Sequence, residues 1–198
     1  MVLHADLPAQ REPRREQALL ESLPYGRRLE LERRSPEQRR ASLAGVDLVL
    51  AGLERCTGLR VEPASLQFPQ GGKPRVAGGP SFSISHCTSL VGMALVDDGE
   101  IGFDVEARDA PGKGRAHEMS RAVASATLEQ WTAIEAVLKA VGTGLESAVE
   151  VELAADLRTA RLHGQELWLQ PVDLGPGYIA AIATTRPLVT VEVAKVQL

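Results

Sequence analysis

Residues 101–106 (IGFDVE) constrain the fold of this chain more than any other stretch. Side chains alternate along a β-strand, so Asp104 and Glu106 are expected on one face, about 7 Å apart, while the apolar residues face a core. Two carboxylates on one face of an apolar strand repel each other unless a cation, a base or water lies between them. Because hard cations such as Mg²⁺ prefer oxygen ligands, one interpretation is a metal site. The other is a strand that ends at solvent and carries two hydrated acids.

Composition and charge exclude several classes of protein. With 198 residues, of which 44% are hydrophobic and 24% charged, the chain can form one large domain or two half-sized ones. The first residues show no signal peptide, and no segment approaches the roughly 20 apolar residues that cross a bilayer, so no membrane partner is expected. Cys56 and Cys87 lack metal-ligand spacing, which predicts a reduced, cytoplasmic setting. A net charge of −4 does not favour a nucleic-acid partner.

Lysine is rare among the basic residues. Four of the 22 basic residues are lysine, namely Lys73, Lys113, Lys139 and Lys195. A lysine presents a compact ammonium that suits phosphate as a point charge, whereas arginine presents a planar fork. We therefore regard Lys73 and Lys139 as candidate contacts for an anion.

The N-terminal part of the chain predicts helices. Residues 1–34 are rich in arginine and glutamate with scattered leucines, which indicates one or two short surface helices. A longer helix is expected to begin after Ser35, because Pro36 suits a first turn and Gln38 completes a capping box. Apolar residues then recur at helical spacing as far as Gly58, a typical C-terminal stop.

A second helix is expected to begin after Thr127, which forms a capping box with Gln130, and to end at Gly142. Glu135 and Lys139 lie four residues apart and therefore share one face of this helix. They are interpreted either as part of a site with the two strand acids or as a simple surface ion pair.

The other segments predict strands and loops. The expected strands are residues 81–85, 91–96, 101–106, 149–153, 159–163, 165–170, 178–184 and 188–194, with shorter extended runs at 59–62 and 66–68. Segment 70–80 (QGGKPRVAGGP) is expected to be a loop, in which glycines let the backbone approach a ligand. Residues 107–116 are expected to form another loop, followed by a helical region. Because helices and strands alternate similarly in both halves, we expect an α+β fold of two similar lobes.

Four motifs follow one another in a fixed order. They are GGKP, which contains Lys73; FSISH, which ends at His86; IGFDVE; and WTAIEAVLKAVGTGL. In this order the chain resembles the 4′-phosphopantetheinyl transferases, specifically the larger, surfactin-synthetase-activating type. That family typically shows G-K-P, F-N-[IL]-S-H-S, [IV]-G-[IV]-D-[IV]-E and W-x-x-K-E-[AS]-x-x-K-x-x-G-x-G-L. The likeness extends over about residues 35–187.

The resemblance implies both a fold and an activity. The implied fold is a pseudodimer of two similar lobes with a cleft between them, and hence a monomer. Residues 1–97 would form the N-terminal lobe that contacts the coenzyme A nucleotide, and residues 98–198 the lobe with the metal and catalytic residues. The implied reaction transfers the 4′-phosphopantetheine arm of coenzyme A to a serine of an acyl or peptidyl carrier protein. It releases 3′,5′-ADP and requires Mg²⁺, with Mn²⁺ as an alternative.

Individual site residues follow from the matching positions. The implied metal ligands are Asp104, Glu106 and Glu135, and the implied catalytic residues are Asp104, Glu135 and Lys139. The implied coenzyme A contacts are Lys73, Pro74, Ser85, His86, Lys139 and Arg40. Arg40 is adjacent to Ala41, which stands where the family has a basic helix residue.

The chain departs from the family pattern at several positions. Ile134 replaces the lysine that precedes the helix glutamate, and segment 107–130 is shorter than usual. Ser83 and Cys87 replace the Asn and Ser that flank Ile-Ser-His. An alternative is therefore a catalytically impaired member that binds coenzyme A or a carrier protein without transfer. A third possibility is a metal-dependent enzyme that uses the same acids on another nucleotide diphosphate.

Overall fold

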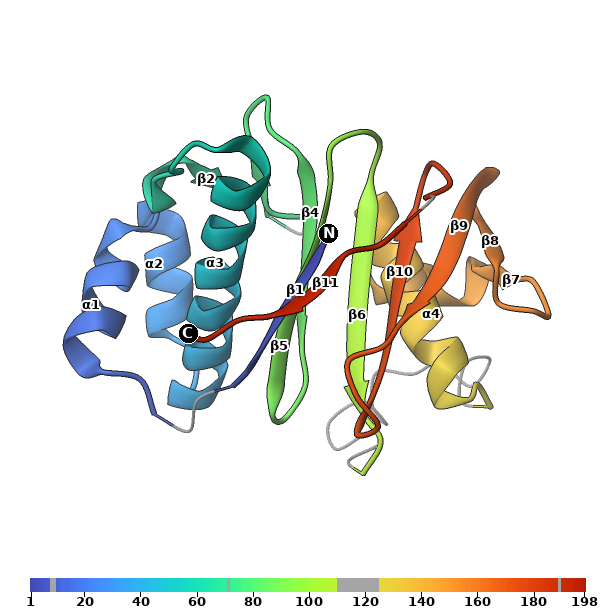
Figure 1. Ribbon diagram of the computed structural model, residues 1–198, viewed down its shortest axis with the longest axis horizontal. Coiled ribbons are helices and arrows are strands. Elements are labelled where there is room, and N and C mark those ends of the chain that lie inside the picture. Colours follow the sequence, from blue (N-terminus) through green and yellow to red (C-terminus); the bar gives the residue numbers. More distant parts are fainter. Residues whose placement is uncertain (8–9, 71, 110–124, 189) are drawn as a thin grey trace.

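The computed structural model describes residues 1–7, 10–70, 72–109, 125–188 and 190–198 and shows a mixed α+β fold (Figure 1). The α+β class expected from the sequence is confirmed. Of the loop expected at 107–116, residues 110–116 lie outside the described part of the chain, as does most of the helical region expected after it. Within the described part, the helices are too short or too polar to cross a membrane.

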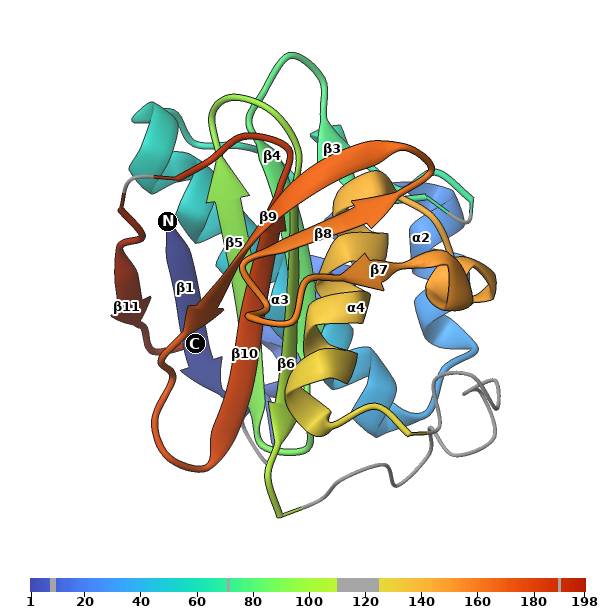
Figure 2. The same cartoon turned by 90° about the vertical axis from the view of Figure 1, so that its right-hand side faces the viewer.

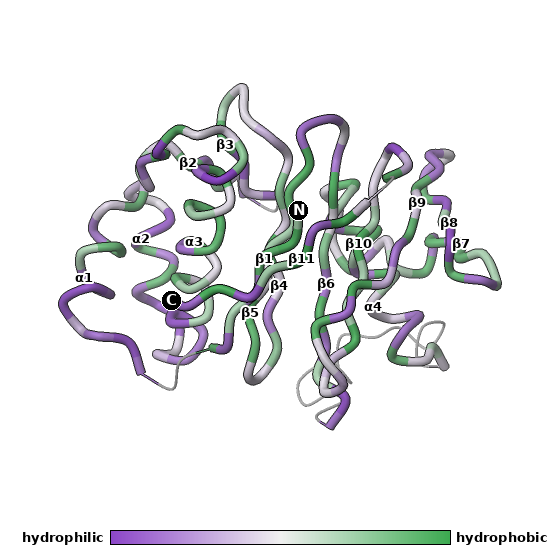
Figure 3. The backbone as a smooth tube through the Cα atoms, in the orientation of Figure 1, coloured by the Kyte–Doolittle hydropathy of each residue, from purple (hydrophilic) through white to green (hydrophobic). Residues whose placement is uncertain are grey.

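The first sheet has the strand order β11-β1-β5-β4. Its strands are β1 (Val2–Asp6), β4 (Ser81–His86), β5 (Leu90–Val96) and β11 (Val193–Lys195). One face packs against the helices α1 (Pro13–Ser22), α2 (Tyr25–Glu32) and α3 (Pro36–Thr57). Hydrophilic stretches lie on α1 and α2, the outer helices (Figure 3), as the arginine- and glutamate-rich sequence predicts. After α3 come the short 3₁₀ helix η1 (Pro63–Ser65) and a separate two-stranded hairpin, β2 (Leu66–Gln67) and β3 (Arg75–Val76).

The second sheet has the order β6-β10-β9-β8-β7 and is antiparallel throughout. Its strands are β6 (Ile101–Ala107), β7 (Glu152–Leu153), β8 (Thr159–Leu162), β9 (Gln165–Val172) and β10 (Tyr178–Thr184). Helix α4 (Leu128–Val141) lies across one face of it (Figure 2), and the 3₁₀ helix η2 (Leu145–Glu150) follows α4. The opposite face shares a core with the first sheet, to which Val2, Phe103 and Ile182 contribute.

Both predicted helix boundaries are confirmed. Ser35 caps α3 in a capping box with Gln38, and Gly58 ends the helix in the left-handed conformation at φ 71°. The α4 boundaries follow the same pattern, with a Thr127–Gln130 capping box at the start and a left-handed Gly142 at the end.

The strands differ from expectation at both termini and in one internal segment. Strand β1 was not predicted, because both of its faces are buried and its sequence VLHAD does not alternate. Residues 149–153 were expected as one strand, but η2 extends to Glu150 and β7 is only two residues long. The C-terminal strand β11 is also shorter than the expected segment 188–194, and it pairs in parallel with β1 of the first sheet. Residues assigned by sequence to the C-terminal lobe therefore complete the N-terminal sheet.

Helix α4 approaches β6 unusually closely at Gly102. A Cβ atom added to Gly102 would overlap the backbone oxygen of Ala136 and the backbone nitrogen of Ala140. Both of these atoms belong to the α4 backbone, so a side chain at position 102 can be accommodated only if the helix moves. Gly102 thus sets the distance between α4 and the strand that carries Asp104.

We predict that Gly102→Ala lowers the free energy of unfolding by about 2–3 kcal/mol, because the added methyl group forces α4 away from β6. Chemical denaturation monitored by circular dichroism measures this change. The matched control is Gly26→Ala in α2, where an added Cβ meets nothing within 4 Å. This control should be neutral or slightly stabilising. Equal stability of the Gly102→Ala variant and the wild type would contradict the packing described.

Candidate functional site

The two strand acids are buried. Asp104 is 0% exposed and Glu106 is 5% exposed, so the interpretation as hydrated acids at a solvent-exposed strand end is wrong. Phe103 and Val105 on the other face are fully buried in the core between the sheets, as predicted. The acids are buried because α4 covers their face of β6. A buried carboxylate is costly unless a cation or hydrogen-bond donors compensate its charge.

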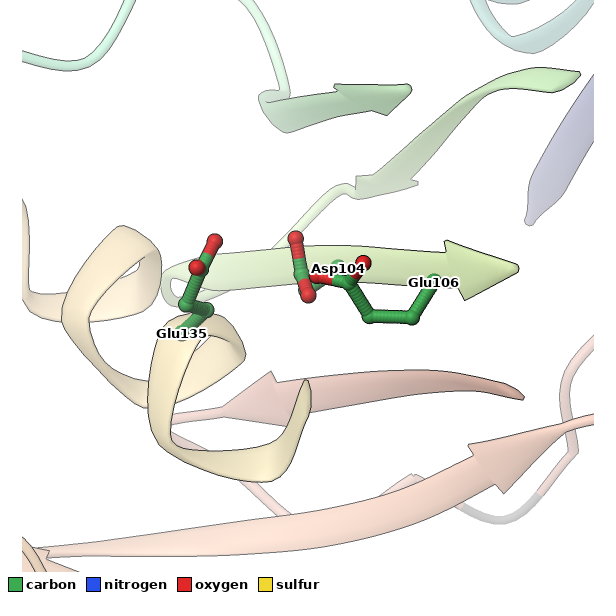
Figure 4. Close-up of side chains that lie close together, drawn as sticks. All are labelled: Asp104, Glu106 and Glu135. Atoms are coloured by element: carbon green, nitrogen blue, oxygen red, sulfur yellow. The ribbon is translucent and has the colours of Figure 1, made fainter. Parts of the chain in front are cut away.

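Glu135 joins the two strand acids from α4. Ligand atoms of Asp104, Glu106 and Glu135 lie within 4.8 Å of one another. Figure 4 shows Glu135 reaching from the helix toward Asp104, with Glu106 further along the strand. The structure thus brings together the three acids expected from the sequence.

The Lys139 ammonium contacts this acid cluster (Asp104, Glu106 and Glu135). Its Nζ donates a hydrogen bond to Asp104 Oδ1 at 2.6 Å and lies 3.6 Å from Glu135 Oε2. It also donates to Ser85 Oγ at 3.0 Å, and Ser85 Oγ donates to the same Asp104 oxygen at 2.7 Å. Lys139 and Ser85 therefore both stabilise the charged form of Asp104, and Glu135 and Lys139 are more than a surface ion pair.

The donor set suits a hard divalent cation. Three carboxylates on a rigid helix and strand offer the oxygen ligands that Mg²⁺ and Mn²⁺ prefer. The Lys139 ammonium already occupies a position beside them, which shows that the cluster attracts positive charge. The residues present therefore fit a metal of this class.

A cleft of about 1100 Å³ lies beside the acid cluster. Its walls come from α2, α3, the β2–β3 hairpin, β4 and the C-terminal end of α4. Its described lining includes five basic residues, Arg27, Arg34, Lys73, His86 and Lys139. Lys139 both lines the cleft and contacts Asp104, and it therefore connects the cleft with the acid cluster, whose three acids are not among the described lining residues.

The sequence-predicted coenzyme A contacts occupy different places. Lys73, Pro74, His86 and Lys139 line the cleft. Ser85 is buried behind them, with its hydroxyl hydrogen-bonded to Asp104. Arg40 lies in the first turns of α3 and is not among the described residues that line the cleft.

Two arginines of the cleft wall were not predicted. The Arg27 guanidinium stacks 4.8 Å from the centre of the Phe68 ring, and Arg34 donates to Ser42 Oγ at 3.1 Å. Glu30 lies between them and accepts hydrogen bonds from Arg27 at 2.7 Å and Arg34 at 2.5 Å. Burial tends to raise the pKa of Glu30, but the two arginines outweigh that effect and hold its pKa below the ordinary value. In the sequence, the arginines are marked only by their positions three residues before and four residues after Glu30, a spacing typical of ion pairs on one helix face.

Ile134 is buried where the family pattern has a lysine. It is 6% exposed and packs with Trp131 and Val137 in the apolar core between α4 and the second sheet. Its side chain therefore contributes to packing and supplies no charge to the site.

Comparison with known proteins does not identify the chain. No protein-family model matches it, and no curated protein sequence matches it either. The resemblance to the 4′-phosphopantetheinyl transferases therefore rests on the four ordered motifs.

We predict that Lys139→Met destabilises the protein by about 2 kcal/mol, because it removes the charged hydrogen bond that compensates buried Asp104. Thermal denaturation with EDTA and with millimolar Mg²⁺ or Mn²⁺ measures both the loss and its recovery. Metal should raise the melting temperature of Lys139→Met more than that of the wild type, because the metal takes over charge compensation at the acid cluster.

The control for this measurement is Lys195→Met, which removes an exposed lysine paired with Asp6 on the first sheet. It should respond to metal as the wild type does. If metal stabilises neither Lys139→Met nor the wild type relative to EDTA, the acid cluster does not bind a divalent cation.

Proposed function

We propose that the protein is a Mg²⁺-dependent 4′-phosphopantetheinyl transferase. It would transfer the 4′-phosphopantetheine arm of coenzyme A to a serine of an acyl or peptidyl carrier protein and release 3′,5′-ADP. The observation that carries this proposal is the position of Lys139, which contacts Asp104 and Glu135 and also lines the cleft. The two sheets with their covering helices would be the two similar lobes of a pseudodimer, so that a monomer suffices.

The cleft suits an anionic nucleotide. Coenzyme A carries a 3′-phosphate and a pyrophosphate, and the cleft wall offers Arg27, Arg34 and His86 in addition to Lys139. Two of these cations are arginines, whose forked guanidinium groups bind phosphate oxygens in pairs. A volume of about 1100 Å³ is large enough for a ligand of this size.

The reaction requires one bond to form and one to break. The carrier serine oxygen attacks the phosphorus that bears the pantetheine arm, and the bond from that phosphorus to the bridging pyrophosphate oxygen breaks. In the proposed mechanism Glu135 accepts the serine proton, and Lys139 stabilises the negative charge on the departing 3′,5′-ADP. A divalent ion held by Asp104, Glu106 and Glu135 would supply Lewis-acid stabilisation of the pyrophosphate oxygens.

A second candidate function is binding without transfer. Ile134 is buried in the apolar core and cannot supply the cation that the family pattern places there. The chain would then be a descendant that binds coenzyme A or a carrier protein and lacks turnover. Lys139 and Glu135 would remain as binding residues in that case.

We predict that incubation with coenzyme A, Mg²⁺ and an apo carrier protein adds the mass of the phosphopantetheine arm to the carrier. Intact-protein mass spectrometry measures the gain, with fatty-acid and secondary-metabolite carriers in the same panel. Asp104→Asn should slow the transfer by at least about 100-fold, because it removes the carboxylate charge that holds Lys139 and would hold the metal. Lys195→Met, far from the cleft, should transfer at the wild-type rate.

Coenzyme A binding measured by calorimetry, combined with no mass gain on any carrier, would support the binding-only candidate. No mass gain together with no binding of coenzyme A or of any carrier in the panel would refute both. Circular dichroism of Asp104→Asn confirms that a loss of transfer does not arise from unfolding.

A further inference from the structure

The ammonium of Lys73 is fully engaged by partners within the protein. Its Nζ donates to Ser81 Oγ at 2.6 Å, to Glu100 Oε2 at 2.8 Å and to the backbone oxygen of Ile101 at 2.5 Å. A lysine ammonium has three hydrogens, so these three acceptors use all of them. An anion in the cleft would have to displace one of these acceptors in order to bind Lys73 directly.

The three groups around Lys73 also bind one another. Ser81 Oγ donates to Glu100 Oε2 at 2.7 Å, which closes a ring of hydrogen bonds among the two side chains and the ammonium. Burial lowers the pKa of Lys73, and the hydrogen bond and charge of Glu100 act against this shift. Glu100 therefore helps to keep a largely buried ammonium charged, since a desolvated cation is costly without its partner.

This ring links the cleft wall to the strand that carries the acids. Lys73 belongs to the segment between β2 and β3, of which Phe68, Gln70 and Pro74 also line the cleft. Glu100 immediately precedes β6, and Ile101 is its first residue, only three positions before Asp104. The Lys73–Glu100 pair thus spans from the cleft wall to the second sheet.

We propose that Lys73 is a positioning residue that acts through Glu100. Together they hold the cleft wall, residues 68–70 and 72–74, against the start of β6, and Lys73 makes no contact with the bound anion. The phosphate contacts then come from the other cations of the cleft. The identity of the ligand rests on the proposed function, whereas the link between wall and strand rests on the hydrogen bonds alone.

Substitution of Glu100 distinguishes a positioning role of Lys73 from direct contact with the anion, because the two roles predict opposite changes in the affinity for 3′,5′-ADP. If Lys73 contacted the anion, Glu100→Ala would release the ammonium and strengthen the binding of 3′,5′-ADP. If Lys73 positions the wall, Glu100→Ala weakens binding by about tenfold, because a charge-assisted hydrogen bond is lost. Isothermal titration calorimetry with 3′,5′-ADP and the full-length chain measures the affinity.

A double-mutant cycle completes the test. We expect Lys73→Met and Glu100→Ala to weaken 3′,5′-ADP binding by similar factors, and the double variant to be no weaker than either. Glu192→Ala removes another exposed acid, which pairs with Arg55, and controls for the change in net charge. Tighter binding by Glu100→Ala than by this control, or fully additive losses in the double variant, would overturn the proposal.

A second measurement does not depend on the nucleotide. Hydrogen exchange monitored by mass spectrometry should show about tenfold faster exchange at residues 72–76 in Lys73→Met and in Glu100→Ala, with α4 unchanged. If the wild type fails to bind 3′,5′-ADP, the ligand of the proposed function is wrong. Hydrogen exchange then still tests whether Lys73 and Glu100 hold the cleft wall against β6. Unchanged exchange at residues 72–76 would overturn it.

Discussion

The close approach of α4 to β6 is the constraint on which the site depends. Only a glycine at position 102 lets the helix backbone reach the strand, because any Cβ there would overlap backbone atoms of Ala136 and Ala140. At this distance Lys139 reaches Asp104 and Glu135 joins the two strand acids. The same contact buries the carboxylates, so their charge has to be compensated inside the protein or by a bound cation. The packing of α4 on β6 thus buries the carboxylates and also places Lys139, which compensates their charge, beside them.

A second constraint is the boundary between β4 and β6, where side chains join the two sheets. Ser81, Ser83 and Ser85 alternate along β4 and therefore face the same way. Ser83 Oγ accepts the Phe103 backbone N–H at 3.0 Å, and the other two hydroxyls bind the carboxylates of Glu100 and Asp104. A lysine contacts the serine at each end of this row, because Lys73 donates a hydrogen bond to Ser81 and Lys139 donates one to Ser85. Two of the four lysines in an arginine-rich chain therefore serve the boundary that connects the cleft with the acids.

The sequence predicted the features that depend on local chemistry. The caps at Ser35 and Thr127, the strand at 101–106 and the shared face of Glu135 and Lys139 follow from side chains a few residues apart. Prediction from the sequence was wrong or incomplete where the structure depends on contacts between segments far apart in the chain. The acids are buried because α4, which begins 24 residues after Asp104, covers them. The Glu100 partner of Lys73 lies 27 positions away, and β11 completes the sheet of β1. Neither periodicity nor capping contains information on such pairings, and Arg27 and Arg34 of the cleft were missed for the same reason.

The proposed function requires that the acid cluster and the cleft act as a single site, in which a metal at Asp104 would lie next to the pyrophosphate of coenzyme A. Phosphorus NMR of coenzyme A bound in the presence of substoichiometric Mn²⁺ tests this claim most directly, because the paramagnetic ion broadens nearby phosphorus resonances most strongly. The account predicts that the two pyrophosphate resonances broaden far more than the 3′-phosphate resonance, and that Asp104→Asn abolishes the difference. Equal broadening of all three resonances, or selective broadening that persists in Asp104→Asn, would contradict it.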